Sequence, residues 1–439
     1  MTELTACTQF RSPLHVETMI APFIANGNSE GETESALVRE GVDLQLPSRD
    51  QRKNASAEEG ADSAGVMMRL DTASTSELLY VGFNQDKGCF ACGTDSGFRI
   101  FNCDPFKQTY RRDFANGGIG IVEMLFRCNI LALVGGGRNP RYPPNKVMIW
   151  DDHQNRCIGE LSFRSEVKAV RMSRERVVVV LEYKIYVYNF ADLNLLNTVE
   201  TVSNPKGLCS LCADSRLCVL ACPGLQKGHL RVELFDMSRS TLINACESAL
   251  SCLALNTDGS RLATASERGT LVRVWDTRSG QRLAELRRGA EPAEIQCLSF
   301  NLDSSYLLVS SDHGTIHIFK LSEDVDATAA AAAAATGAAP ETVSGNARSA
   351  FSFLGNLLPR AITPSYIQSQ WSFAQFRLPG SEKTPTRSIA AFGGQDRETF
   401  LVVCADGTFF KCRFDALKGG ECEREDWQRF LFNEDEAAQ

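Results

Sequence analysis

The sequence predicts an all-β protein folded as a seven-bladed β-propeller, and three observations support this fold class. From Leu78 onward the chain consists of short β-branched and aromatic runs separated by Gly, Asn and Asp, which is the pattern of strands and turns. Seven runs end in an aromatic residue or in an aromatic residue followed by Asp, and they span residues 97–101, 146–151, 184–188, 230–236, 270–276, 315–319 and 408–415. The last aromatics of the first six are separated by 49, 38, 47, 40 and 44 residues, which matches a four-stranded propeller blade. An ordinary β-sandwich is the alternative, and the regular recurrence disfavours it.

The repeats organise the chain as one propeller over residues 75–415. Residues 1–74 are mostly rich in polar residues and Gly, and we expect a largely disordered N-terminal arm. The interval from Phe319 to Phe414 is 95 residues, which is one blade plus an insertion of about fifty residues, placed at 321–367 in the sixth blade. We expect strands before Thr94 and after Ser388 to close the ring by pairing within one blade. Residues 416–439 are expected to form a solvated acidic tail.

Composition narrows the function classes. A formal net charge of -8 argues against a nucleic-acid-binding protein, because such domains are usually basic over a whole face. The first residues lack a basic stretch followed by an apolar one, so no secretory leader is expected, and 16 Cys then indicate a reducing, cytoplasmic compartment. No apolar run approaches the roughly 20 residues of a membrane-spanning helix, so any membrane contact is expected to be peripheral. A zinc site at Cys209, Cys212, Cys218 and Cys222 is an open alternative to four small core residues.

One stretch, Leu286-Arg287-Arg288-Gly289, combines two adjacent guanidinium groups with the end of a strand-like run. Successive side chains on a strand point to opposite faces, so Arg287 and Arg288 are placed to serve two ligands rather than one. The pattern therefore predicts two neighbouring anion sites. The alternative is a solvated Arg pair at a sheet edge, as is usual for charged residues.

Three motifs carry a family resemblance: residues 263–270, the Arg-Arg box at 286–289 and residues 310–319. With them, the chain from about residue 76 to 415 resembles the PROPPIN family, the WD-repeat propellers that bind phosphoinositides and act in autophagy. Residues 136–152 are similar to the branch nearest the third and fourth human paralogues. The resemblance implies a peripheral scaffold in autophagosome formation that binds phosphatidylinositol 3-phosphate and phosphatidylinositol 3,5-bisphosphate. It also implies recruitment to preautophagosomal, endosomal or vacuolar membranes, and autophagy-protein partners that include a lipid-transfer protein of the phagophore.

The resemblance also implies which residues bind the lipid head groups. The first site would surround Arg287 and the second Arg288, with the remaining lipid-binding residues being Thr264, Ser266, Gly269, Thr270 and Arg273 at the first and Ser311, His313, Thr315 and His317 at the second. The chemistry is suitable, because a planar guanidinium binds a phosphate bidentately and short hydroxyl groups complete the contacts. One position departs from the family, in which a His normally follows Ala245. This chain has Cys246, a far weaker hydrogen-bond donor.

The insertion contains an apolar segment after its run of alanines at 329–335. Phe351, Leu354 and Leu358 are at helical spacing. Phe353 and Leu357 lie beside them in the sequence. An exposed cluster of this kind needs a partner. The corresponding loop of the family enters the membrane between the two head-group sites, so we expect a membrane anchor here. A hairpin folded back on the propeller is the alternative.

No enzyme and no cofactor or metal is expected. Asp151 and Asp152 are adjacent on a strand, so their carboxylates diverge, and no His or nucleophile is patterned with them. Two other classes remain open at this point. A generic WD-type protein-interaction scaffold would need no Arg-Arg box, and a propeller enzyme would need a catalytic cluster in the central channel.

Overall fold

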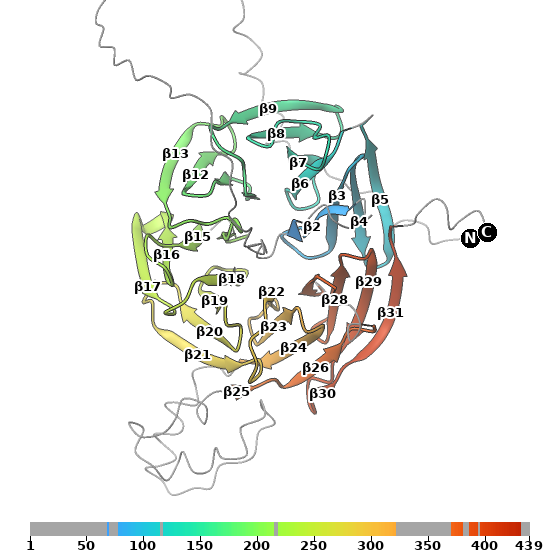
Figure 1. Ribbon diagram of the computed structural model, residues 1–439, viewed down its shortest axis with the longest axis vertical. Coiled ribbons are helices and arrows are strands. Elements are labelled where there is room, and N and C mark those ends of the chain that lie inside the picture. The colour runs from blue at the N-terminus through green and yellow to red at the C-terminus, as the bar shows by residue number, and fades with distance from the viewer. Residues whose placement is uncertain are drawn as a thin grey trace, which may run out of the picture. The chain divides into compact units, whose positions relative to one another are not determined.

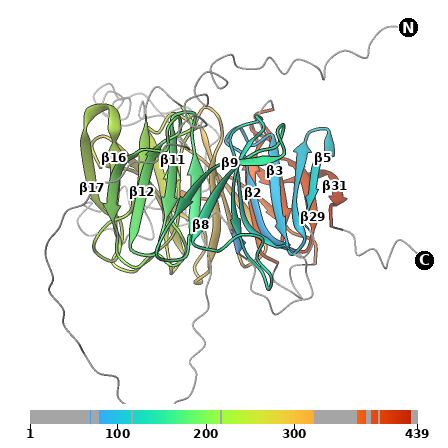
Figure 2. The ribbon, with the colours of Figure 1, turned by 90° about the horizontal axis from the view of Figure 1, so that it is seen from above.

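The computed structural model describes residues 68–69, 78–114, 117–214, 218–321, 370–380, 386–393 and 396–431. In these residues seven sheets stand around a common axis, each forming one blade, so the predicted all-β seven-bladed propeller is confirmed (Figure 1). Seen from the side, the strands of each blade run between the two faces of the ring (Figure 2).

The first four blades follow the chain without interruption. Blade 1 contains β1 (Met68–Arg69), β2 (Leu78–Phe83), β3 (Cys89–Thr94), β4 (Gly97–Cys103) and β5 (Phe106–Asp113). Blade 2 contains β6 (Ile119–Met124), β7 (Ile130–Gly135), β8 (Lys146–Asp151) and β9 (Arg156–Ser162). Blade 3 contains β10 (Ala169–Met172), β11 (Arg176–Val180), β12 (Lys184–Asn189) and β13 (Leu195–Glu200). Blade 4 contains β14 (Ser210–Leu211), β15 (Val219–Pro223), β16 (His229–Leu234), the short 3-10 helix η2 (Phe235–Met237) and β17 (Arg239–Asn244).

Blades 5 and 6 each carry an additional, parallel strand at the outer edge. Blade 5 contains β18 (Leu250–Leu255), β19 (Arg261–Ser266), β20 (Leu271–Asp276), β21 (Arg282–Arg287) and the added β25 (Gln370–Trp371). Blade 6 contains β22 (Ile295–Phe300), β23 (Tyr306–Ser311), β24 (Thr315–Lys320), β26 (Ala374–Arg377) and the added β30 (Gly420–Glu421). Blade 7 contains β27 (Ser388–Phe392), β28 (Thr399–Cys404), β29 (Thr408–Arg413) and β31 (Glu423–Arg429).

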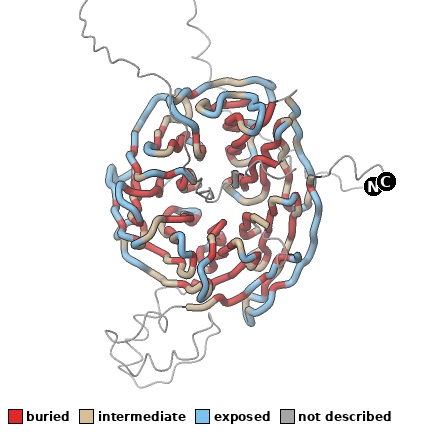
Figure 3. Tube along the Cα trace, in the orientation of Figure 1, coloured by how far each residue is buried: buried red, intermediate tan, exposed pale blue. Residues whose placement is uncertain are grey.

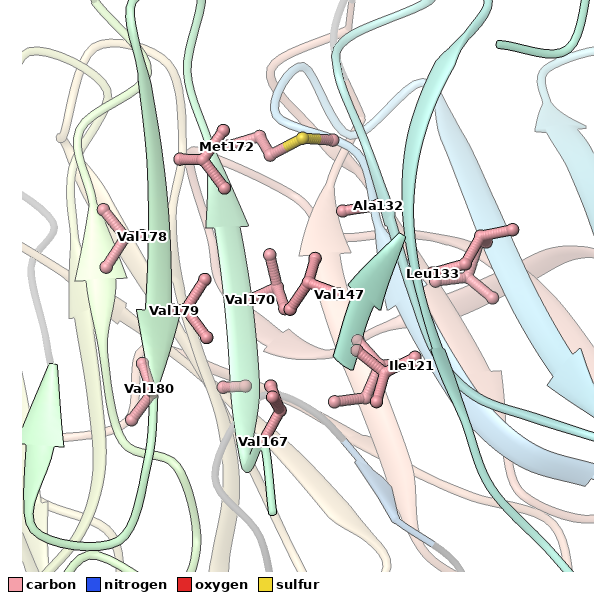
Figure 4. Packing of buried hydrophobic residues seen from close by; sticks show 14 of the residues in the cluster. Ile121, Ala132, Leu133, Val147, Val167, Val170, Met172, Val178, Val179 and Val180 are labelled. Carbon is pink, nitrogen blue, oxygen red and sulfur yellow. The ribbon is translucent and has the colours of Figure 1, made fainter. Parts of the chain in front are cut away.

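The seven aromatic-ended runs of the sequence form the strands β4, β8, β12, β16, β20, β24 and β29. Each is the third strand of its blade, if the additional two-residue strand β1 of blade 1 is left out of the count. Burial follows the position of a strand in its blade: β7 is buried at every residue, whereas β31 is exposed at every residue (Figure 3). Inner strands are buried because neighbouring blades cover both of their faces. Figure 4 shows such an interface, where Val147 of blade 2 lies against Val170 of blade 3. Each fully buried Val contributes about 1.5–3 kcal/mol.

The expectation that one blade combines strands from both ends of the chain is wrong. All described strands of blade 1 come from residues before 114, and all strands of blade 7 come from residues after 387. Blade 7 contains no strand from the N-terminal part of the chain, because β31 pairs with β29 and forms the fourth strand. Side chains close the ring instead, with the Phe90 ring stacked 5.9 Å from Phe409 and in edge contact with Phe430.

The propeller also ends later than the sequence indicated. Residues 416–439 were expected to form a solvated tail, but β30 and β31 lie within them and are hydrogen-bonded into sheets. The charged residues of β31 are compatible with a strand because this strand is the outer edge of blade 7, where its side chains remain in water. Most of the predicted N-terminal arm and nearly all of the inserted loop lie outside the described residues.

Candidate phosphate-binding sites at the Arg-Arg box

The Arg-Arg box ends β21, at the outer part of blade 5. In the antiparallel pairing of β20 and β21, Leu286 lies opposite Val272 and Arg287 opposite Leu271. Leu286 is fully buried in the cluster shared by blades 5 and 6. Strand alternation therefore directs Arg288 toward blade 6, and Arg287 toward the other face of blade 5. The burial of Leu286 thus assigns the two guanidinium groups to opposite faces of blade 5, and their binding of two separate ligands stays a prediction.

Arg288 is held in a buried position between blades 5 and 6. The side chain is only 6% exposed. Its Nε donates to the carbonyl oxygen of Gly269 at 3.2 Å, a terminal nitrogen donates to the carbonyl of Glu291, and the other donates to Nδ1 of His313 at 3.2 Å. Burial lowers the pKa of Arg288, and the negative charges of Asp312 and Glu291 oppose that shift. The result is a positive charge fixed in a poorly solvated site.

The strands of blade 6 place three of the predicted second-site residues toward this guanidinium. Val309 and Phe319 pack in the cluster shared with blade 5, so alternation points Ser311, Thr315 and His317 toward blade 5 as well. Ser311 is 1% exposed and His317 7% exposed. Burial lowers the pKa of His317 to about 4, and the positive charge of Arg288 adds to the shift. His317 is therefore neutral at pH 7.

Two buried polar atoms in this groove have no hydrogen-bond partner: the Oγ of Ser311 and the Nδ1 of His317. A buried polar atom without a partner costs about 1–3 kcal/mol, so native proteins contain few of them and each needs an explanation. Here both belong to side chains that face the groove of a buried guanidinium. A bound anion would supply the missing partner to the Ser311 hydroxyl.

A tight turn at residues 266–269 lies at the predicted first site. Gly269 has a φ of +58°, and a Cβ at this position would lie 1.7 Å from the carbonyl oxygen of Ala293, so only glycine fits. Its amide donates to the carbonyl of Ser266 at 2.9 Å. Ser266, Thr270 and Arg287 are all partly exposed around this turn. Gly269 thus shapes the turn at the predicted first site, and its carbonyl accepts a hydrogen bond from Arg288 of the predicted second site.

Two predicted residues of the first site already have structural roles. Thr264 is buried, and its hydroxyl accepts a hydrogen bond of 2.9 Å from the indole of Trp275 inside the blade. This structural role disfavours the assignment of Thr264 as a lipid-binding residue, and strand spacing alone did not reveal that Trp275 contacts it. Arg273 forms an ion pair of 2.9 Å with Glu285 and donates to the carbonyl of Ala245 at 3.0 Å. The same Glu285 oxygen also pairs with Arg282 at 2.9 Å, so this carboxylate is shared between two guanidinium groups.

Cys246, at the position of the family His, is partly buried beside these groups. Its thiol donates to the carbonyl of Ser248 at 3.1 Å. Burial raises the pKa of Cys246, and the positive charge of Arg273 opposes that shift. The residue is a neutral thiol that caps a turn at the edge of the first site.

The sequence reasoning missed two groups. Glu285 pairs with Arg273, and the carbonyl of Glu291 fixes Arg288. The position of Glu285 on the same strand face as Arg287, two residues away, was a signal for the first. The carbonyl of Glu291 had no sequence signal, because any residue provides a carbonyl.

The predicted membrane-insertion residues 351–358 lie outside the described residues, but both ends of the insertion are described. β24 ends at Lys320, and the chain returns at β25, which pairs in parallel with β21 so that Trp371 lies opposite Arg287. The Arg-Arg box is thus adjacent to one end of the insertion. Among the described residues, no helix is long and apolar enough to cross a membrane.

Comparison with known proteins decides the family. The PROPPIN family model matches residues 77–426, most of the chain. This chain belongs to the PROPPIN family. The PROPPIN is 40% identical to autophagy-related protein 18e of Arabidopsis thaliana over 356 residues, covering 80% of this chain and 88% of the relative. It is 34% identical to autophagy-related protein 18 of Yarrowia lipolytica over 387 residues, covering 79% and 94%.

Solved structures support the same fold. Hsv2 of Kluyveromyces lactis aligns with a TM-score of 0.63 and 22% identity, over 81% of this PROPPIN and all of that chain. KlAtg21, in its complex with the coiled coil of AgAtg16, aligns with a TM-score of 0.64 and 24% identity, over 81% and 100%. Membership of this scaffold family implies an autophagy-related, phosphoinositide-binding propeller that associates peripherally with membranes.

Proposed function

We propose that this PROPPIN binds phosphatidylinositol 3-phosphate and phosphatidylinositol 3,5-bisphosphate through two sites, one on each side of the Arg-Arg box. One observation carries the proposal. The guanidinium of Arg288 is buried, and Ser311 and His317 on the facing side of blade 6 each have a buried polar atom without a hydrogen-bond partner. A phosphate monoester provides up to two negative charges and three acceptor oxygens. It therefore balances the charge of Arg288 and accepts from the Ser311 hydroxyl. Family membership supplies the lipid class.

The second site is composed of Arg288, Ser311, Thr315, His317 and the exposed His313. The first is composed of Arg287 with Ser266, Gly269 and Thr270, and Cys246 replaces the usual His there. Two sites on opposite faces of blade 5, the second completed by blade 6, engage two head groups of one membrane. The second binding event is then intramolecular, and the overall avidity exceeds either affinity. The apolar residues of the insertion, Phe351 among them, then anchor the propeller in the bilayer.

Membrane binding in this manner makes the PROPPIN a peripheral scaffold in autophagosome formation at preautophagosomal, endosomal or vacuolar membranes. Its partners would be autophagy proteins, including a lipid-transfer protein of the phagophore. The complex of KlAtg21 with a coiled coil supports a protein-binding role for propellers of this fold.

Vesicle flotation tests the proposal. Vesicles carry phosphatidylinositol, its 3-phosphate or its 3,5-bisphosphate, and the test variant is Arg287→Thr with Arg288→Thr. Each charge-assisted hydrogen bond is worth about 1.5–3 kcal/mol, so losing both guanidinium groups should weaken binding by about two to four powers of ten. The control is Arg156→Thr with Arg239→Thr, which removes the same charge from β9 and β17. Unchanged flotation of the folded box variant would favour a protein-interaction scaffold that does not bind lipid.

A further inference from the structure

A pocket lined by three arginines lies where the first and last blades meet, away from the Arg-Arg box of blade 5. We call it the seam pocket. It has a volume of about 260 Å³, and its lining residues are Arg99, Phe101, Phe106, Gln108, Arg111, Arg429 and Phe430. They come from β4 and β5 of blade 1 and from the end of β31 of blade 7, which lie side by side in Figure 1. Among the described residues that line the pocket there is no acidic side chain.

The arrangement of the arginines points to an anion. Arg99 lies directly opposite Arg111 in the antiparallel pair of β4 and β5. Like charges in this position destabilise a sheet. Arg429 adds a third guanidinium from the neighbouring blade. Asp113 binds the Nε of Arg111 at 2.7 Å, and both of these side chains are substantially exposed to water. A dianion between the three guanidinium groups could accept charge-assisted hydrogen bonds from each of them.

The phenylalanines that line the pocket indicate that the anionic ligand also contains an aromatic ring. The ring of Phe101 stacks on Phe106 with centroids 5.8 Å apart and meets Phe430 edge-on at 5.3 Å. Phe101 and Phe430 are buried, whereas Phe106 is partly exposed. An aromatic ring in the pocket would continue this cluster, and contacts between aromatic rings are worth about 0.5–1.5 kcal/mol beyond burial.

We propose that the seam pocket binds an aromatic phosphate monoester. The phosphate contacts Arg99, Arg111 and Arg429, and the ring packs on the phenylalanines. Such a ligand contacts blade 1 and blade 7 together. Because no described strand is shared between these blades, the bound ligand also ties the two ends of the ring together. The proposal does not depend on phosphoinositide binding at the Arg-Arg box.

The test uses phenyl phosphate as the probe and inorganic phosphate as its comparison, in the full chain carrying Arg287→Thr and Arg288→Thr so that the box does not contribute. Calorimetry should show phenyl phosphate binding about three to ten times more tightly than inorganic phosphate, as the aromatic contact predicts. Phenyl phosphate should also raise the melting temperature, because it binds the folded ring.

Arg99→Gln and Arg429→Gln should each weaken phenyl phosphate binding at least about tenfold, the effect of losing a hydrogen bond to a charged group. Arg429 lies on an exposed outer strand, so its replacement tests the pocket even where Arg99→Gln lowers the yield of folded protein. Arg239→Gln on β17 is the control and should leave binding unchanged. Equal affinity for the two phosphates, no binding, or equal losses from the control and pocket variants would each overturn the proposal.

Discussion

Ser311→Ala should make the propeller more stable while making it a weaker phosphoinositide binder. The Ser311 hydroxyl is 1% exposed and has no hydrogen-bond partner, so the folded protein bears its desolvation cost of about 1–3 kcal/mol. Alanine removes that cost but leaves a small void. We therefore expect the free energy of unfolding to rise by about 1 kcal/mol. The lost hydrogen bond to a charged phosphate should weaken the second site roughly tenfold to a hundredfold.

Denaturant unfolding measures the stability, and calorimetry with soluble short-chain phosphatidylinositol 3-phosphate measures the binding. Thr201→Val is a matched control, because the Thr201 hydroxyl is also buried without a partner but belongs to blade 3. It should stabilise the protein to a similar extent and leave lipid binding unchanged. A destabilised Ser311→Ala variant, or one that binds the lipid as well as the parent chain does, would refute the assignment of Ser311 to the site.

Three further predictions follow from the same geometry. Deleting residues 346–362 should abolish flotation with vesicles but preserve binding of soluble lipid; vesicle binding that survives the deletion would show that this segment is not the anchor. Arg288→Ala should weaken vesicle binding more than Arg287→Ala, and Cys246→His should narrow the difference, which calorimetry would measure; equal losses and no effect of the added His would make Cys246 irrelevant. The pKa of His317 is lowered to about 4 from 6.5, so the unfolded chain takes up a proton first as the pH falls. The unfolding free energy should therefore drop by up to about 3 kcal/mol between pH 7 and 4, and His317→Gln should flatten this slope in denaturant titrations.

The repeats and the split of the Arg-Arg box could be read from the sequence because both depend on local geometry. A strand of known direction alternates its side chains, so the opposite orientations of Arg287 and Arg288 required no knowledge of the neighbouring blades. The aromatic residue at the end of the seven repeated strands recurs because each blade is the same structural unit and buries its apolar face against neighbouring blades in the same way. Ser311, Thr315 and His317 followed from the family motif, and the structure places them on the face of blade 6 that turns toward Arg288.

Contacts between distant segments were decided only by the tertiary structure. Whether Thr264 faced a ligand or the indole of Trp275 depended on the filling of the blade interior. Blade 7 is completed by β31, which pairs with β29. The charged sequence of β31 by itself indicated a solvated tail, because nothing in it shows that β29 has an unpaired edge nearby. The unpartnered atoms of Ser311 and His317 exist only because blades 5 and 6 meet there and exclude water from both. Strand period is a property of neighbouring residues, whereas desolvation is imposed by segments far away in the chain. For that reason the sequence indicated the two arginines as candidate anion-binding residues but not the environment that surrounds them.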